Sequence, residues 1–376
     1  MTHFSFTYRN ADLKAYSDFR QQIRRFLSRD PAAQTPRADC WSQFDAGFSR
    51  RLAEEGLLGL TWPKQYGGQE RSALERFILL EELLAAGVPV AAHWISERQV
   101  GPLLLRYGTE AQKEAYLPAI LRAELFFCIG LSEPDSGSDL ASLRTRADRT
   151  DGGWIVNGRK IWTSNAHRSH FMVLLCRTSP GSQRHQGLSQ LIIDMKSAGL
   201  TIRPIPNISR EHEFNEVTFD DVFVPEDRLI GSEGNGWEQV TSELAFERSG
   251  PERFMSSFVL LRQLRQSGHQ LPPEMLGELT GRFMALRSLS ISVAAMLDEG
   301  KLPNLEAALV KELGSRLEQD IGEALLNCLD AMPDPDSAAS YERLLAQNLL
   351  HAPSYSIRGG AREILRGIIA RGLGMR

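Results

Sequence analysis

The chain has 376 residues, of which 42% are hydrophobic and 24% charged, and its formal net charge at pH 7 is -4. This apolar fraction excludes an intrinsically disordered protein, and no apolar run reaches the about 18 residues that a membrane-spanning helix needs. The 43 basic and 47 acidic residues nearly balance, so the chain lacks the excess of positive charge that is typical of a nucleic-acid-binding protein. The four cysteines lie far apart, which argues against a metal site or a disulfide framework and favours a cytoplasmic protein.

The first part of the chain, residues 1–124, is expected to be helical. Apolar residues recur at helical intervals at 13–27 and 44–57, with Asp12 and Ser42 as the expected N-caps. A Pro- and Gly-containing loop at 62–68 precedes a further helix. Thr109, followed three residues later by Gln112, predicts a capping box that opens another helix.

The pattern changes to that of strands in residues 125–232. Short apolar runs at 126–129, 171–175 and 191–193 predict buried strands, and a β-branched and aromatic run at 217–225 predicts a last one. The dipeptide Asn157-Gly158 predicts the turn of a β-hairpin.

Helical periodicity returns in residues 233–376. The expected helices cover about 238–265, 273–298, 305–329, 340–350 and 361–373, with a linker at 330–337. Helices, then strands, then helices make an α+β arrangement of segregated elements rather than alternating βαβ units.

Two short segments carry groups suited to binding a cofactor. Residues 132–139 place hydroxyls, glycine and backbone amides in a tight loop, which suits an anion or an electron-rich ring but is also typical of a surface turn. Residues 162–165, Trp-Thr-Ser-Asn, put an indole beside two hydroxyls. This pattern suits a flat cofactor, and equally a core tryptophan at the end of a strand.

These segments, taken together, resemble the acyl-CoA dehydrogenase family. The similar stretches follow one another in the family's order, and they are residues 57–68, 81–83, 107–118, 132–139, 157–165 and 214–225. The resemblance implies an N-terminal helical domain at 1–124, a middle β domain at 125–232 and a C-terminal four-helix bundle at 233–376.

The resemblance also implies a cofactor, FAD, and an acyl-CoA thioester as substrate. The backbone of Ile129, Leu131 and Ser132 would meet the flavin, together with the Ser132 hydroxyl. Trp162 and Ser164 would pack against the isoalloxazine and hydrogen-bond to it. Ser138 would lie near the coenzyme A moiety.

The family reaction is α,β-dehydrogenation, in which a carboxylate removes the α-proton. In one branch that base lies late in the chain, where this sequence has Gly359. In the other branch it precedes an arginine on the first bundle helix, where this sequence has Glu247 and Arg248. We therefore expect Glu247 to be the base and Arg248 to help bind coenzyme A or place a loop, with Glu243 and Glu252 as competitors for the base.

The sequence departs from the family pattern where a subunit holds its neighbour's FAD. Residues 265–273 lack the family's arginine followed by Phe-Gly, and residues 325–332 lack its Gln-x-x-Gly-Gly stretch. We expect a heterotetramer with a homologous subunit, acting on a bulky, branched or steroid-derived acyl-CoA, with an electron-transfer flavoprotein as acceptor. A homotetramer, a flavin oxidase or monooxygenase, and a non-catalytic scaffold subunit are the alternatives.

Overall fold

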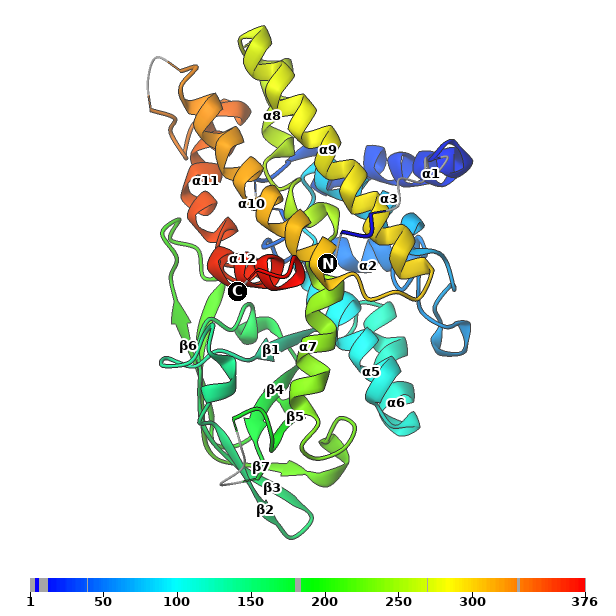
Figure 1. Ribbon diagram of the computed structural model, residues 1–376, viewed down its shortest axis with the longest axis vertical. Helices are drawn as coiled ribbons and strands as arrows, with labels where there is room; N and C mark the ends of the chain where they lie inside the picture. Colours follow the sequence, from blue (N-terminus) through cyan, green and yellow to red (C-terminus); the bar gives the residue numbers. More distant parts are fainter. Residues whose placement is uncertain are drawn as a thin grey trace. The chain divides into compact units, whose positions relative to one another are not determined.

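The chain forms two compact units (Figure 1). The computed structural model describes residues 4–6, 13–38, 40–179, 184–268, 270–329 and 332–375, without the side chains of 243–247. One unit contains Met1–Phe48, Glu70–Ala91 and Ala245–Arg376, and the other Ser49–Gln69 and Ala92–Leu244. The N-terminal helices α1 and α3 thus share a unit with the C-terminal helices.

The first unit is helical. Its helices are α1 (Ser17–Arg29), α3 (Ala73–Ala86), α8 (Phe258–Ser267), α9 (Pro273–Asp298), α10 (Asn304–Leu326), α11 (Ser340–Tyr355) and α12 (Arg362–Gly372), while α2 (Ala46–Glu54) crosses the boundary. The core is formed by apolar side chains that include Leu84, Phe254, Val259, Val310, Leu317, Ile321 and Leu344. Figure 1 shows α9, α10 and α11 running beside one another, as the helical periodicity of this part of the sequence predicts.

Arginines of the C-terminal part form ion pairs with buried carboxylates of α10. Arg362 and Arg366 of α12 both bind Glu312 of α10, with nitrogen–oxygen distances of 2.9 Å. Arg358, just before α12, donates to the buried Glu318 of α10 at 3.2 Å. These pairs fasten the end of the chain to the middle of the bundle.

The helix expected at 238–265 is wrong in its extent. Two helices occupy this stretch, α7 (Gly236–Glu247) and α8 (Phe258–Ser267), separated by a short 3-10 turn at Pro251–Arg253. Gly250 and Pro251 interrupt the helix, because proline cannot donate the backbone hydrogen bond that a continuing helix needs. Because the helical spacing of apolar residues continues across this break, the sequence pattern did not predict where α7 ends and α8 begins.

The second unit combines helices with one sheet. Its elements are α4 (Ala91–Ile95), α5 (Gly101–Tyr107), α6 (Glu110–Leu121), β1 (Phe127–Gly130), β2 (Arg146–Thr150), β3 (Gly153–Lys160), β4 (Phe171–Arg177), β5 (Leu188–Asp194), β6 (Leu200–Ile205), β7 (Phe214–Pro225) and most of α7. The seven-stranded sheet has the order β1-β4-β2-β3-β7-β6, with β5 paired to β4. Strand β4 is parallel to β1 and β2, and the other pairs are antiparallel.

Strand β4 is apolar throughout because both of its faces are buried. Met172 and Leu174 lie on one face of the sheet, in an apolar cluster with Trp154 and Phe219. Val173 points the other way and packs with side chains of α5 and α6. The continuous apolar run at 171–175 therefore predicts this strand correctly.

The expected hairpin turn at Asn157-Gly158 is wrong. Both residues lie inside β3, and the turn between β2 and β3 falls at residues 151–152. Asn157 exchanges two hydrogen bonds with Asp221 of β7, at 2.8 and 3.0 Å, where the register between the two strands shifts. The dipeptide serves a bulge rather than a turn.

Two of the expected helix starts have clear outcomes. Thr109 and Gln112 form the predicted capping box, with reciprocal bonds of 3.2 Å. Ser42 is not an N-cap, because α2 begins at Ala46 and the Asp45 carboxylate accepts from the Phe48 N–H at 2.9 Å.

Asp12, the other expected N-cap, lies outside the described residues, as do the first two residues of the expected linker at 330–337. Within the described ranges, no helix is long and apolar enough to cross a membrane.

Candidate functional site

Two backbone carbonyl groups of the segment that follows β1 accept hydrogen bonds from the end of β3. The Leu131 carbonyl accepts from the Lys160 ammonium at 2.9 Å, and the Ser132 carbonyl accepts from the Ile161 N–H at 2.9 Å. Ile129 and Leu131 are half-buried and pack against separate apolar clusters of the second unit. The structure therefore brings Leu131 and Ser132, which directly follow β1, next to the end of β3.

Residues 133–136 make a tight turn. Glu133 and Ser136 exchange backbone hydrogen bonds of 2.8 and 3.0 Å, and the Ser136 hydroxyl donates to the Asp139 carbonyl at 2.7 Å. Ser138 lies on the exposed part of this loop, after Gly137, where an added Cβ would meet no atom within 4 Å. The loop is thus anchored at its base and open around Ser138.

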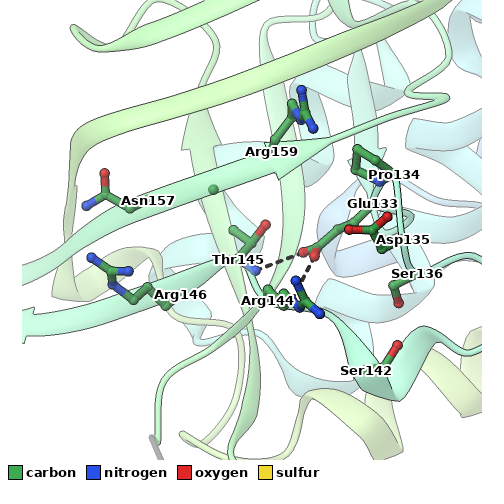
Figure 2. A pocket seen from close by; sticks show the side chains of 11 residues that line it. Glu133, Pro134, Asp135, Ser136, Ser142, Arg144, Thr145, Arg146, Asn157 and Arg159 are labelled. Atoms are coloured by element: carbon green, nitrogen blue, oxygen red, sulfur yellow. Dashed lines mark hydrogen bonds between the residues drawn. The ribbon is translucent and has the colours of Figure 1, made fainter.

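A buried ion pair forms that base. Lys160 and Glu133 lie 2.9 Å apart, with side chains 0% and 8% exposed. The Glu133 carboxylate also accepts from the Arg144 and Thr145 N–H groups at 2.7 and 2.9 Å (Figure 2). This pair was not predicted from the sequence, because its partners are 27 residues apart and no local spacing signals the contact.

The two charges of this pair support each other. Burial by itself raises the pKa of Glu133, but the Lys160 ammonium and the hydrogen bonds from Thr145 and Arg144 outweigh it, so the pKa lies below its ordinary value. Burial lowers the pKa of Lys160, and the Glu133 carboxylate opposes that change. Glu133 is therefore a carboxylate at neutral pH, and it cannot act as a proton-accepting base while it holds Lys160.

Trp162 follows β3 in a left-handed backbone conformation, with φ of 59°. Trp162 is 57% exposed, and its indole meets the Phe214 ring edge-on with the ring centroids 5.9 Å apart. The next residue, Thr163, exchanges backbone bonds of 3.0 and 3.1 Å with Asn215, which fixes this unusual conformation. A bulky residue held in that region costs about 1–3 kcal/mol, and such strained residues are enriched at active and ligand-binding sites.

The residues around Trp162 fit a flavin. Its indole leaves a large apolar surface exposed, as a planar ring requires for stacking. Beside it the Thr163 hydroxyl is buried and, among the described residues, has no hydrogen-bond partner. Ser164 is half-buried at the same turn. An apolar face with hydroxyls at its edge suits a ring whose rim carries polar atoms.

The expected base lies at the end of a helix. Glu247 is the last residue of α7, and its side chain lies outside the described part of the chain. Arg248 is buried, and its Nε donates to the Gly359 carbonyl at 3.2 Å. Both Gly359 and Gly360 have positive φ, 64° and 104°, which favours glycine at these positions. Arg248 thus connects the end of α7 to the loop where the alternative base would lie.

Models of protein families match nearly the whole chain. They are described as the N-terminal, middle and C-terminal domains of acyl-CoA dehydrogenase, and they match residues 14–124, 128–222 and 234–374. The chain belongs to the acyl-CoA dehydrogenase family. It is therefore an oxidoreductase acting on acyl-CoA, and FAD is the family's cofactor.

Individual proteins similar to this chain are themselves named acyl-CoA dehydrogenases. The chain is 35% identical over 335 residues to acyl-CoA dehydrogenase IpdE1 of Mycobacterium tuberculosis, covering 86% of each chain. It is also 35% identical over 369 residues to acyl-CoA dehydrogenase FadE29 of the same organism, covering 94% of each chain.

Solved structures of the family share the fold. The Tcur3481-Tcur3483 steroid ACAD superposes with a TM-score of 0.86 at 30% identity, covering 96% of this chain and 98% of that one. The ChsE4-ChsE5 complex from Mycobacterium tuberculosis gives a TM-score of 0.82 at 27% identity, covering 98% of both chains. The predicted fold, helices followed by a β domain and a helical bundle, is confirmed.

Proposed function

We propose that this acyl-CoA dehydrogenase converts an acyl-CoA to a 2-enoyl-CoA, with Glu247 as the base that removes the α-proton. The observation that carries the proposal is the arrangement at the two candidate positions. A glycine in left-handed conformation, Gly359, occupies the late one, and a glutamate ends α7 at the early one. We retain the three domains at 1–124, 125–232 and 233–376 as part of this proposal.

The reaction needs a base because a C–H beside a thioester is a weak acid. A carboxylate removed from water has a raised pKa and becomes a better proton acceptor. We assign the proton to the Glu247 carboxylate, and we assign Arg248, through its bond to the Gly359 carbonyl, to holding the end of α7 in place. Ser138, exposed on its loop, would contact the coenzyme A moiety.

The chemistry that bound FAD would supply is acceptance of the β-hydride at N5. The chain would hold it through the backbone of Ile129, Leu131 and Ser132 and the Ser132 hydroxyl. Trp162 would pack against the ring and Ser164 would hydrogen-bond to it. The exposed Trp162 indole and the carbonyl bonds that fix residues 131 and 132 support this assignment.

We further propose that the chain works in a heterotetramer with a homologous subunit. The support is the absence of the family's FAD-holding residues from 265–273 and 325–332, together with the similarity to the two-protein ChsE4-ChsE5 complex. The bulky substrate is proposed to be steroid-derived, by similarity to a structure described as a steroid ACAD. An electron-transfer flavoprotein would reoxidise the flavin.

One experiment tests these assignments together. The chain is produced alone and with homologous subunits encoded beside it, and flavin content is measured before anaerobic titration with a panel of acyl-CoAs. We expect the pair to bind more flavin than the chain alone and to bleach with bulky acyl-CoAs. A full complement of flavin and full activity in the chain alone would refute the heteromer, and reoxidation by O2 faster than by the flavoprotein would favour an oxidase.

A further inference from the structure

One carboxylate of α10 contacts two segments of the first unit that lie far apart in the sequence. Glu318 is fully buried, and its Oε1 accepts from the Ser256 N–H at 2.8 Å. Its Oε2 accepts from the Arg358 guanidinium at 3.2 Å, and the same guanidinium nitrogen donates to the Ser256 hydroxyl at 2.9 Å. Glu318, Ser256 and Arg358 therefore form a closed triangle of hydrogen bonds.

The two segments joined by this triangle are those with the two candidate positions of the base. Ser256 lies on the chain between α7, which ends at Glu247, and α8. Arg358 directly precedes Gly359, the late position. The triangle thus attaches both segments to a single helix.

Arg248 connects the triangle to the end of α7. Its Nε donates to the carbonyl of Gly359 at 3.2 Å, and Gly359 is the residue next to Arg358. Arg248 itself directly follows Glu247 in the sequence. A continuous series of contacts therefore runs from Glu318 to the residue beside the proposed base, and all of its members belong to the first unit.

Further contacts make α10 a firm support for the segment between α7 and α8. The Ser257 hydroxyl donates to the Glu318 carbonyl at 2.9 Å and accepts from the Asn348 amide of α11 at 2.9 Å. Both Ser257 and Asn348 are fully buried. Gly314 of α10 lies against the backbone of this segment, since an added Cβ would be 2.1 Å from the Arg253 carbonyl oxygen. Buried polar groups linked in this way favour one arrangement of the chain.

The buried pair of Glu318 and Arg358 suits positioning better than it suits stability. Their side chains are only 1% and 10% exposed. Replacement of such a pair by apolar side chains of similar volume is often neutral or even stabilising for a fold. A planar guanidinium, however, fixes the directions of its donors, which apolar contacts do not.

We propose that Glu318 and Arg358 are positioning residues for the reaction, which set the place of Arg248, and with it the end of α7, through the carbonyl of Gly359. The inference rests on the proposed function, because it concerns the helix end that bears the proposed base. A displacement of about 1 Å in a reacting group can slow a reaction about a hundredfold. Loss of the triangle should therefore lower the rate of proton removal more than the affinity for the substrate.

Anaerobic stopped-flow reduction of the flavin by a bulky acyl-CoA separates these two effects, because it gives both a limiting rate and a Kd. The protein is used with its partner subunit if the two assemble. Glu318→Gln keeps the size of the side chain but replaces one of its acceptors by an amide that cannot accept from Arg358. The matched control is Glu312→Gln, which breaks the contacts of the same helix to Arg362 and Arg366 instead.

We expect Glu318→Gln to lower the limiting rate by about tenfold to a hundredfold, with flavin content unchanged and the Kd of the acyl-CoA altered by less than about twofold. Glu312→Gln should keep the parental rate. The double variant Glu318→Gln/Arg358→Gln should be no slower than Glu318→Gln, because the two side chains act as a unit. Ser256→Ala removes one hydroxyl of the triangle and should show the same selective loss by a smaller factor, even if Glu318→Gln does not fold.

A parental limiting rate in Glu318→Gln, or in Ser256→Ala where only that variant folds, would overturn the inference. So would a loss confined to the Kd or to flavin content, since the role would then be structural. Equal slowing in Glu312→Gln would also overturn it, because any weakening of α10 would then have the same effect.

Glu247→Gln, measured in the same series, separates this inference from the proposed function. If Glu247→Gln is slow and Glu318→Gln is normal, the proposed function stands and the positioning role fails. If Glu247→Gln is normal and Glu318→Gln is slow, the assignment of the base fails and the positioning of Arg248 stands.

Discussion

Lys160 fixes the loop next to the proposed flavin site through two contacts, the Leu131 carbonyl and the Glu133 carboxylate, both at 2.9 Å. In Lys160→Met the Glu133 charge stays buried without its partner, and we expect a loss of about 3–5 kcal/mol in the free energy of unfolding. Chemical denaturation measures this loss, and flavin content should fall with it.

The control for this prediction is the exposed pair of Arg149 and Glu226, whose side chains are 56% and 64% exposed. Arg149→Gln should change the free energy of unfolding by less than about 1 kcal/mol. An equally small effect for Lys160→Met would show that the buried pair does not hold the loop.

His93 of α4 is buried, and its Nδ1 atom lies 2.8 Å from the Ser49 Oγ atom. Burial lowers the pKa of His93 from 6.5 to about 3. The folded state then binds the proton more weakly than the unfolded chain, so stability is complete above pH 6.5 and falls as the pH drops toward 3. The full effect is on the order of 5 kcal/mol.

Denaturation of the parent and of His93→Gln between pH 7 and pH 4, by about half-unit steps, measures this contribution. We expect the variant to lose less stability than the parent on acidification. Parallel pH profiles would contradict the assignment of the acid sensitivity to His93.

Single residues also show where sequence reasoning ends. The motif residues Ser132 and Trp162 could be selected from the sequence, because each lies in a short stretch of consecutive residues with a recognisable composition. The exposed, left-handed Trp162 and the buried Lys160 could not, since both depend on contacts with distant strands. The roles assigned to the site residues stay predictions.

At the scale of elements, the close packing of β3 against the start of β2 depends on Gly158. A Cβ there would lie 2.5 Å from the Thr145 Oγ1 and 2.7 Å from its Cα. We expect Gly158→Ala to cost about 1–3 kcal/mol in the free energy of unfolding. Gly137→Ala is the control, because no atom lies within 4 Å of its Cβ position, and thermal unfolding should barely change. Equal melting temperatures for both variants would refute this packing argument.

An ion-pair cluster joins α12 to the Glu312 carboxylate of α10. Glu312 binds both Arg362 and Arg366, and these arginines overcome the effect of burial and lower the pKa of Glu312. In Glu312→Gln we expect amide exchange across Arg362–Gly372 to accelerate by about tenfold, equivalent to about 1.4 kcal/mol of local stability. Glu363→Gln, at an exposed position of α12, should leave the exchange unchanged.

Elements were predictable where their signals were local. Caps and apolar runs give α6 and β4 directly, whereas Asn157-Gly158 carries the composition of a turn and forms a bulge. The break between α7 and α8 is concealed because apolar spacing continues on both sides of Gly250. Composition alone does not distinguish a turn from a bulge at Asn157-Gly158, whereas the pairing of β3 with β7 does.

At the scale of the whole molecule, α7 joins the two units, since Leu244 belongs to one and Ala245 to the other. The proposed flavin-facing residues lie in the second unit, and Arg248 lies in the first. Glu247, the proposed base, is the last residue of α7. The order of domains was predictable from motifs spread along the chain, but the division into these two units was not.

Anaerobic stopped-flow reduction of the flavin by a bulky acyl-CoA tests whether Glu247 removes the α-proton. In Glu247→Gln, with flavin content and unfolding temperature unchanged, we expect reduction to slow by about a thousandfold, the range of general-base contributions. Glu243→Gln and Glu252→Gln should still reduce their flavin. A normal rate of flavin reduction in Glu247→Gln would show that Glu247 is not the base. So would a rate that is lost only in Glu243→Gln or only in Glu252→Gln.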